Sequence, residues 1–263
     1  MNLLTIGLMS LGLAPMPPAA ETVDRFEAHE FVLGSGSSRQ VFPYRLLKPA
    51  HIEPGKTYPV VLFLHGAGER GSDNKVQLLY LPEFMASDAP RARFPCFLIA
   101  PQCPSEKKWV DVNWSEEHSV PSGELNDEAR AVIGMLDEVE QKYLVDRKRE
   151  YLTGLSMGGY GTWALAIAFP ERFAAVVPIC GGGDEKQAAR LTDVPIWAAH
   201  GADDKAVPVQ RSRTMIEAVR QAGGHPRYTE YPGVGHQSWM PAYSDPEGVI
   251  PWMFQQVNKR RGS

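Results

Sequence analysis

The stretch Tyr-Leu-Thr-Gly-Leu-Ser-Met-Gly-Gly at residues 151–159 decides the fold. It combines an apolar strand, a serine between two glycines and the first turn of a helix, in the order G-x-S-x-G that forms a nucleophile elbow. Side chains at Gly154 and Gly158 would collide with the neighbouring strand and helix at so sharp a turn. The predicted helix continues to residue 169 and directs the positive end of its dipole at Ser156. The stretch therefore predicts an exposed serine hydroxyl where a developing anion is stabilised.

Strand-like and helix-like segments alternate on both sides of this elbow. Apolar runs at 59–64 and 95–100 are typical of strands that are buried on both faces of a sheet. The other predicted elements are an opening hairpin at 26–33 and 41–47, strands at 174–179, 195–199 and 227–231, and helices at 209–221 and 249–258. The alternation predicts an α/β fold in which helices cover a mostly parallel sheet, as one domain over residues 21–263.

A long helix is predicted after residue 121, with Ser122 as its N-cap. Its apolar face holds Leu125, Ala129, Val132, Ile133, Leu136, Val139 and Tyr143 at helical spacing. The segment 180–195 is a short glycine-rich connection, so we expect no large cap domain over the site.

The bulk composition is that of an ordinary globular protein. The chain has 263 residues, of which 43% are apolar and 22% charged, with a net charge of −4. Because its only basic cluster is the short run at 259–261, the charge pattern does not suggest nucleic-acid binding.

The first 20 residues differ from the rest. Residues 3–14 are apolar and uncharged, and a proline- and alanine-rich stretch follows at 15–20. This length suits the core of a signal peptide and is too short for a membrane span. We therefore expect an exported protein with a leader at 1–20, with a cytoplasmic location as the alternative. No later segment is long and apolar enough to span a bilayer.

The three cysteines, Cys96, Cys103 and Cys180, form no disulfide framework. Seven extended residues separate the first two by more than the bridging distance. We expect buried free thiols. No cysteine and histidine residues have the spacing of a zinc site, so no metal is expected.

An alcohol needs a base within hydrogen-bond reach to become a nucleophile. Three histidines follow Ser156 in the sequence. His236 lies in a glycine-rich loop after the last predicted strand, and we expect it to be the base. His225 lies before that strand, at the opposite end of the sheet. His200 ends a strand, where a role in shaping the loop is expected.

A carboxylate should orient the imidazole, and it should follow the strand at 195–199. The loop there contains Asp203 and Asp204. Spacing alone leaves both open as the acid.

Two backbone N–H groups should hold the oxyanion of the reaction. Met157, directly after the nucleophile, supplies one. The second should come from Leu-His-Gly-Ala-Gly-Glu-Arg-Gly at 64–71, with Ala67 as the first choice and Gly66 as the alternative. His65 is expected to brace this loop rather than to react, and Glu69 and Arg70 are expected to pair.

Six motifs together resemble the α/β-hydrolase superfamily. They are L-H-G-A-G-E-R-G at 64–71, A-P-Q-C-P at 100–104, W-V-D-V-N-W at 109–114, G-L-S-M-G-G-Y-G-T-W at 154–163, H-G-A-D-D-K-A-V-P at 200–208 and G-V-G-H at 233–236. Within the superfamily the chain is similar to bacterial carboxylesterases and predicted peptidases of the dienelactone-hydrolase and polyhydroxybutyrate-depolymerase type.

The resemblance implies that Asp204 is the acid and that Ala67 supplies the second oxyanion N–H. It also implies a serine carboxylesterase for small or short-acyl esters, with a small-molecule ester as its partner and no cofactor. The alternatives are a serine peptidase of the prolyl-oligopeptidase type, a feruloyl or acetylxylan esterase, and a non-catalytic binding module on the same scaffold.

Three tryptophans are candidates for the walls of a substrate pocket. Trp109 and Trp114 lie in the long irregular stretch 101–121, where they either stack on an acyl group or hold the loop in place. Trp239 lies three residues after His236 and is a candidate for another wall.

Overall fold

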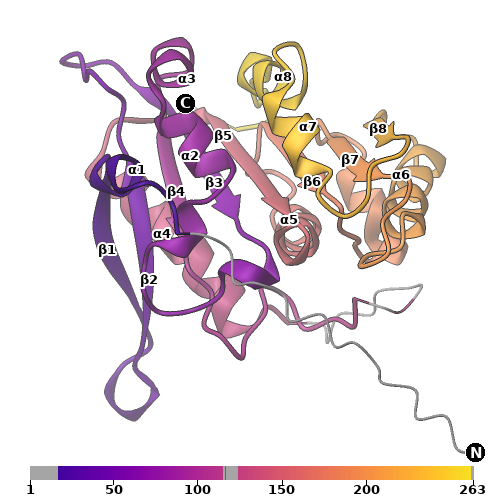
Figure 1. Cartoon of the computed structure of the whole chain (residues 1–263), viewed down its shortest axis with the longest axis horizontal. Coiled ribbons are helices and arrows are strands. Elements are labelled where there is room, and N and C mark those ends of the chain that lie inside the picture. The colour runs from indigo at the N-terminus through magenta and orange to yellow at the C-terminus, as the bar shows by residue number, and fades with distance from the viewer. Residues whose placement is uncertain (1–16, 115, 117–123, 262–263) are drawn as a thin grey trace, which may run out of the picture.

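An eight-stranded sheet runs through the computed structural model, which describes residues 17–114, 116 and 124–261 (Figure 1). The strand order is β1-β2-β4-β3-β5-β6-β7-β8, with β1 on the left of the view and β8 on the right. The strands are β1 (Phe26–Leu33), β2 (Gln40–Leu47), β3 (Tyr58–Leu64), β4 (Phe97–Pro101), β5 (Val145–Leu155), β6 (Ala175–Ile179), β7 (Trp197–Gly201) and β8 (Arg227–Tyr231). β1 and β2 form the predicted antiparallel hairpin, and β3 to β8 run parallel.

Helices pack on both faces of the sheet. The α-helices are α1 (Ala20–Asp24), α2 (Leu81–Ala86), α3 (Asp88–Arg93), α4 (Asp127–Lys142), α5 (Met157–Ala168), α6 (Gln210–Gln221), α7 (Trp239–Ser244) and α8 (Val249–Gln255). Short 3₁₀ helices are η1 (Gly36–Ser38), η2 (Ala67–Glu69), η3 (Val76–Leu78) and η4 (Glu185–Leu191). One apolar core lies between the sheet and α4, α5 and α6, and a second lies between the sheet and α2, α7 and α8.

The predicted α/β-hydrolase architecture is confirmed by this layering. Every residue of β3, β4 and β6 is buried, as expected of central parallel strands covered by helices on both faces. Parallel strands end at a common edge, and here β3, β5, β7 and β8 bring the loops at 65–71, 156, 202–208 and 232–236 to that edge. We call it the C-terminal edge of the sheet.

The predicted start of the long helix is wrong. The helix begins at Asp127, and the side chain of Asn126 caps it by accepting the Ala129 N–H at 3.0 Å. Ser122 lies outside the described residues, and Leu125 precedes the helix. An asparagine side chain accepts from the backbone as well as a serine does, so two competent caps lay close together in the sequence.

The fully described connection between β6 and β7 holds only a glycine-rich loop and η4, as predicted, so no cap domain is inserted there. The three cysteines are buried and free, which confirms their prediction. Most of the predicted leader, residues 1–16, lies outside the described residues. In the part of the chain that the structure describes, every helix is too short or too polar to cross a bilayer.

Candidate active site

Ser156 occupies the strained turn that the elbow motif predicts. Its backbone has φ 54° and ψ −118°, a left-handed conformation that costs a residue other than glycine about 1–3 kcal/mol. A Cβ at Gly158 would lie 1.9 Å from the Leu64 carbonyl oxygen, and one at Gly154 would lie 2.5 Å from the Gly158 carbonyl oxygen. Glycine at both positions therefore allows β5, α5 and β3 to approach closely enough to hold the serine in this conformation.

Three loops bring Ser156, His236 and Asp204 together at the C-terminal edge. The Nε2 atom of His236 lies 2.9 Å from the Ser156 hydroxyl, and its Nδ1 lies 2.7 Å from Oδ2 of Asp204. Because a carboxylate only accepts hydrogen bonds, Nδ1 carries the proton and Nε2 is left to accept from the serine. The three groups form one continuous line of hydrogen bonds.

Asp204, rather than Asp203, is the acid that contacts His236. Its other oxygen, Oδ1, accepts the N–H groups of Ala206 and Val207 at 2.8 and 2.9 Å. Burial opposes its ionisation, but the hydrogen bonds from His200, His236 and Val207 prevail and hold the pKa of Asp204 well below its ordinary value. Asp203 is exposed, and its backbone N–H binds the Val234 carbonyl in the adjacent loop.

His200 contacts the same carboxylate, which the sequence reasoning did not predict. This fully buried imidazole has its Nε2 3.2 Å from Asp204 Oδ2 and 3.1 Å from the Val207 carbonyl, while Nδ1 lies 2.7 Å from the Ser212 hydroxyl. Its expected role in shaping the loop fits the last two contacts. The one feature of the sequence that could have predicted this contact is the position of His200, four residues before Asp204. His225 is exposed before β8, at the other end of the sheet.

The expected oxyanion donors both begin a helix. Met157 is the first residue of α5, and Ala67 is the first residue of η2, positions at which the N–H has no acceptor within the helix. Gly66 lies against Ser156, because a Cβ there would be 3.6 Å from the Ser156 Cβ. Both residues considered for the second donor thus lie in the loop at 64–71, and Ala67 is the one at the start of a helix.

His65 fixes the orientation of the peptide that carries the Ala67 N–H. The carbonyl of Gly66 lies 2.6 Å from His65 Nδ1, and Nε2 of that ring accepts the Cys103 N–H at 2.9 Å. An amide N–H can only donate, so the ring proton is on Nδ1 and is donated to Gly66. Burial lowers the pKa of His65 to about 4, and the ring stays neutral. In a trans peptide the N–H points opposite to the carbonyl, which directs the Ala67 N–H away from His65.

The expected pairing of Glu69 with Arg70 is wrong. Arg70 donates to the carbonyls of Ala67, at 2.9 Å, and Lys107, at 3.3 Å. Glu69 turns inward and is 5% exposed. Burial raises its pKa, while the N–H groups of Gly66 and of Glu69 itself act against the increase. Both side chains stabilise the loop at 64–71 through backbone groups.

The three tryptophans, considered as pocket walls or as anchors of a loop, lie in different surroundings. Trp109 is 2% exposed, and its Nε1 donates to the His65 carbonyl at 3.0 Å, so it holds the loop rather than lining a pocket. Trp114 is half-buried beside Lys108, and its carbonyl accepts the Tyr160 hydroxyl. Trp239 packs edge-on against His236, with ring centroids 5.3 Å apart.

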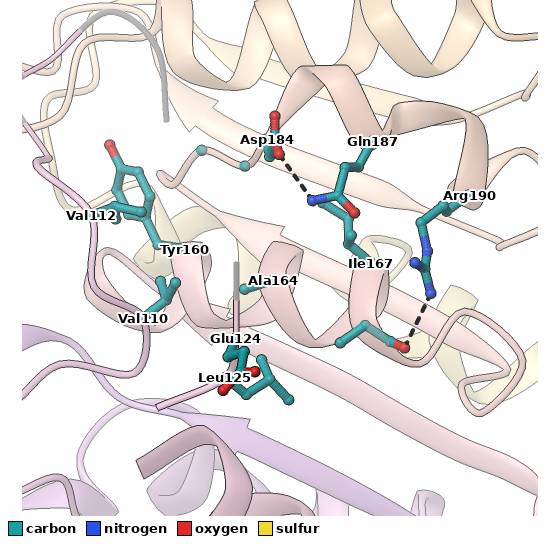
Figure 2. Close-up of a pocket in the computed structure, with 13 residues that line it drawn as sticks. Val110, Val112, Glu124, Leu125, Tyr160, Ala164, Ile167, Asp184, Gln187 and Arg190 are labelled. Carbon is teal, nitrogen blue, oxygen red and sulfur yellow. Dashed lines mark hydrogen bonds between the residues drawn. The ribbon is translucent and has the colours of Figure 1, made fainter. Parts of the chain in front are cut away.

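A groove of about 190 Å³ lies along the outer side of α5 (Figure 2). Tyr160, Ala164 and Ile167 form one side of it. The polar side chains on the other side bind within the protein: Gln187 donates to Asp184 at 2.9 Å, and Arg190 donates to a carbonyl of α5. Neither Ser156, His236 and Asp204 nor Trp239, which packs against the His236 ring, lines this groove, so we do not assign it to the active site.

Cys180 lies close to Asp204 and His236. Its sulfur and the nearest atoms of Asp204 and His236 all lie within 4.8 Å of one another. Burial raises the pKa of the thiol, so it stays protonated, and Asp204 and His236 already bind each other. Asp204 and His236 therefore fit a hydrogen-bonded pair better than a metal-ligand set with Cys180, which would need a thiolate.

The chain is similar to a known protein family and to a solved esterase structure. The profile of the family described as Phospholipase/Carboxylesterase (Abhydrolase_2) matches residues 52–245. A solved thermostable esterase superposes with a TM-score of 0.80 and 39% identity, over 90% of this chain and 64% of that one.

Two curated proteins are more distant relatives. Poly(3-hydroxyalkanoate) depolymerase C of Paucimonas lemoignei is 36% identical over 35% of this chain, which spans only 21% of the depolymerase. A probable feruloyl esterase C of Aspergillus oryzae is 23% identical over 88% of this chain and 76% of its own length.

Proposed function

The chain belongs to the phospholipase/carboxylesterase family and has the α/β-hydrolase fold, and from this premise we propose that it is a serine carboxylesterase for small or short-acyl esters. The observation that carries the proposal is the line of hydrogen bonds from Ser156 through His236 to Asp204. Such a line converts an unreactive alcohol into a nucleophile at neutral pH.

The proposed reaction proceeds through an acyl-enzyme. Nε2 of His236 takes the proton of Ser156 as Oγ attacks the ester carbonyl carbon. The Asp204 carboxylate stabilises the imidazolium, and the N–H groups of Ala67 and Met157 hold the oxyanion. The imidazolium then gives its proton to the departing alcohol. Water, activated by the same imidazole, releases the acid and restores Ser156.

The preference for short acyl groups rests on the open edge of the sheet. The connection between β6 and β7 adds no cap, so this segment provides no deep apolar enclosure for a long chain. The expected profile across p-nitrophenyl acetate, butyrate, hexanoate and octanoate has its highest kcat/KM at the two shortest esters. A maximum at octanoate would contradict this part of the proposal.

A fluorophosphonate probe tests the nucleophile directly. We expect covalent labelling of the wild-type chain and of Ser38→Ala, an exposed serine in the β1–β2 turn. Ser156→Ala should lose both the label and the hydrolysis of p-nitrophenyl acetate. Labelling that persists in Ser156→Ala would overturn the assignment.

A hydroxycinnamoyl ester is the second candidate substrate, because a probable feruloyl esterase aligns with 88% of the chain. Methyl ferulate and an acetylated sugar measured beside p-nitrophenyl acetate separate these possibilities by kcat/KM. Aminoacyl and prolyl amides belong in the same panel. A preference for the amides would replace the esterase proposal with a peptidase.

A further inference from the structure

Two aromatic side chains join α2 to α7 beside the candidate active site. Trp239, the first residue of α7, packs edge-on against the His236 ring. Its indole also packs against Tyr80, with centroids 5.4 Å apart, and Tyr80 is the residue directly before α2. These contacts connect the imidazole to a part of the chain that follows β3 by more than a dozen residues.

Tyr80 has the same unusual backbone conformation as the nucleophile. Its φ of 66° and ψ of −110° lie close to those of Ser156. A bulky residue in this region is strained, and such strain is concentrated at functional sites. Burial, and to a smaller extent the Glu69 carboxylate, raise the pKa of the Tyr80 phenol.

Tyr80 and Trp239 line an apolar groove of about 380 Å³ between α2 and α7. Ser156, His236 and Asp204 do not line it, and Trp239 is the side chain that joins the groove to the His236 ring. Phe84 and Met240 line its sides, and Met240 is 54% exposed. Buried Tyr243 also lines it, with its hydroxyl 2.9 Å from Thr153, three residues before the nucleophile. Glu83 is the single charged side chain among the described residues that line this groove.

We propose that this groove binds the alcohol part of the ester and selects alcohols with an apolar or aromatic group. The inference rests on the proposed function. The leaving oxygen must come within hydrogen-bond distance of His236 Nε2 to receive its proton. The group attached to that oxygen therefore begins beside the imidazole, where Trp239 packs. Aromatic side chains bind such a group through area burial and edge-to-face contact.

The test compares acetate esters that share an acyl group and differ in the alcohol. We expect wild-type kcat/KM to be higher for benzyl acetate than for ethyl acetate. Met240→Ala and Phe84→Ala should each reduce the benzyl-to-ethyl ratio by about tenfold. Leu144→Ala is the matched control, because Leu144 is equally exposed at 54% but lies before β5, at the opposite edge of the sheet. Its ratio should equal that of the wild-type chain.

Deacylation distinguishes the two sides of the ester. Both acetates give the same acetyl-enzyme, from which the alcohol has left, so the deacylation rate measured in single turnovers should not change in Met240→Ala or Phe84→Ala. A slower deacylation with an unchanged benzyl-to-ethyl ratio would place the acyl group in the groove and overturn the proposal. An unchanged ratio and an unchanged deacylation rate would also overturn it. If the chain is not a serine esterase, the wild-type chain takes no fluorophosphonate label and the esters are inert in every variant. If another residue is the nucleophile, the label persists in Ser156→Ala. Both results are distinct from those above.

Discussion

The Nε2 atom of His200 lies 3.2 Å from Oδ2 of Asp204, the same oxygen that His236 reaches at 2.7 Å. The carboxylate thus has one fully buried imidazole on its inner side and one partly exposed imidazole on its outer side. Two backbone N–H groups hold its other oxygen. His200 therefore meets the line of hydrogen bonds at Asp204, and we expect it to act as a positioning residue through that carboxylate.

Removing the inner imidazole should alter the pH dependence of hydrolysis. His200 lowers the pKa of Asp204, so in His200→Leu that pKa should rise and activity should be lost at a higher pH than in the wild-type chain. We also expect kcat at pH 7 to fall by about tenfold, because a carboxylate with one anchor fewer orients His236 less well. His200→Gln, which retains a donor, should restore part of both effects. A loss of kcat with an unmoved acid limb would show that His200 only maintains the packing of the loop.

The two neighbouring aspartates should differ sharply on mutation. Asp204→Asn preserves the shape of the side chain but removes the charge that fixes the imidazole tautomer, so kcat should fall by roughly 10³–10⁴-fold. Asp203 is exposed and contributes its backbone N–H, so Asp203→Asn should stay within about twofold of the wild-type chain. Steady-state hydrolysis of p-nitrophenyl acetate measures both. A larger loss of kcat in Asp203→Asn than in Asp204→Asn would show that Asp203 is the acid.

The elbow should tolerate no side chain at Gly158. A Cβ there would lie 1.9 Å from the Leu64 carbonyl oxygen and 2.5 Å from its carbon, and backbone atoms cannot move aside cheaply. We expect Gly158→Ala to lower the free energy of unfolding by more than about 3 kcal/mol and to abolish fluorophosphonate labelling. Gly68→Ala is the matched control in the loop at 64–71, where a Cβ meets nothing within 4 Å. Equal urea midpoints for the two variants would contradict the close approach of β3 and α5.

A buried charge cluster lies at the other end of the sheet. Glu150, fully buried in β5, pairs with Arg172 at 3.0 Å and with Arg261 near the C-terminus. Glu140 pairs with the same two arginines. Burial, with the Glu140 carboxylate nearby, raises the pKa of Glu150 to about 7 against the attraction of both arginines.

This raised pKa predicts how stability depends on pH. Between pH 4.5 and about 7 the folded chain keeps a proton on Glu150 that the unfolded chain has lost, so the fold loses stability as the pH rises. Glu150→Gln does not titrate. Its free energy of unfolding relative to the wild-type chain should increase between pH 5 and pH 8, by at most about 3 kcal/mol. Urea unfolding at both pH values measures this. Glu171→Gln, with a 76% exposed side chain, is the control, and parallel pH curves for both variants would refute the expectation.

The sequence predicted the elbow and the place of His236 because each carries a local signal. Gly154 and Gly158 flank Ser156 at the spacing of the elbow motif, and His236 lies in a glycine-rich loop after the last strand. The choice between Asp203 and Asp204 was beyond local reasoning. Adjacent residues in a loop point in different directions, and which of them turns inward depends on His200 and the Val207 N–H.

Other features depended on tertiary contacts that no pattern expresses. From the sequence, Trp109 could line a pocket or hold its loop in place. The hydrogen bond from its indole to the His65 carbonyl, which links two distant segments, decides for the second role. Arg70 follows Glu69 in the sequence, yet carbonyls of two separate segments take its hydrogen bonds. The strain at Tyr80 had no sequence signal, because nothing in that stretch resembles the glycine-flanked elbow.

The hydrogen bond from the Cys103 N–H to His65 constrains how this scaffold can be diversified. A deletion between β4 and Cys103 would withdraw the amide that keeps the His65 proton on Nδ1. The backbone donor at Ala67 would then lose its alignment although no residue near Ser156 had been replaced. Libraries aimed at this enzyme should hold residues 101–109 at constant length.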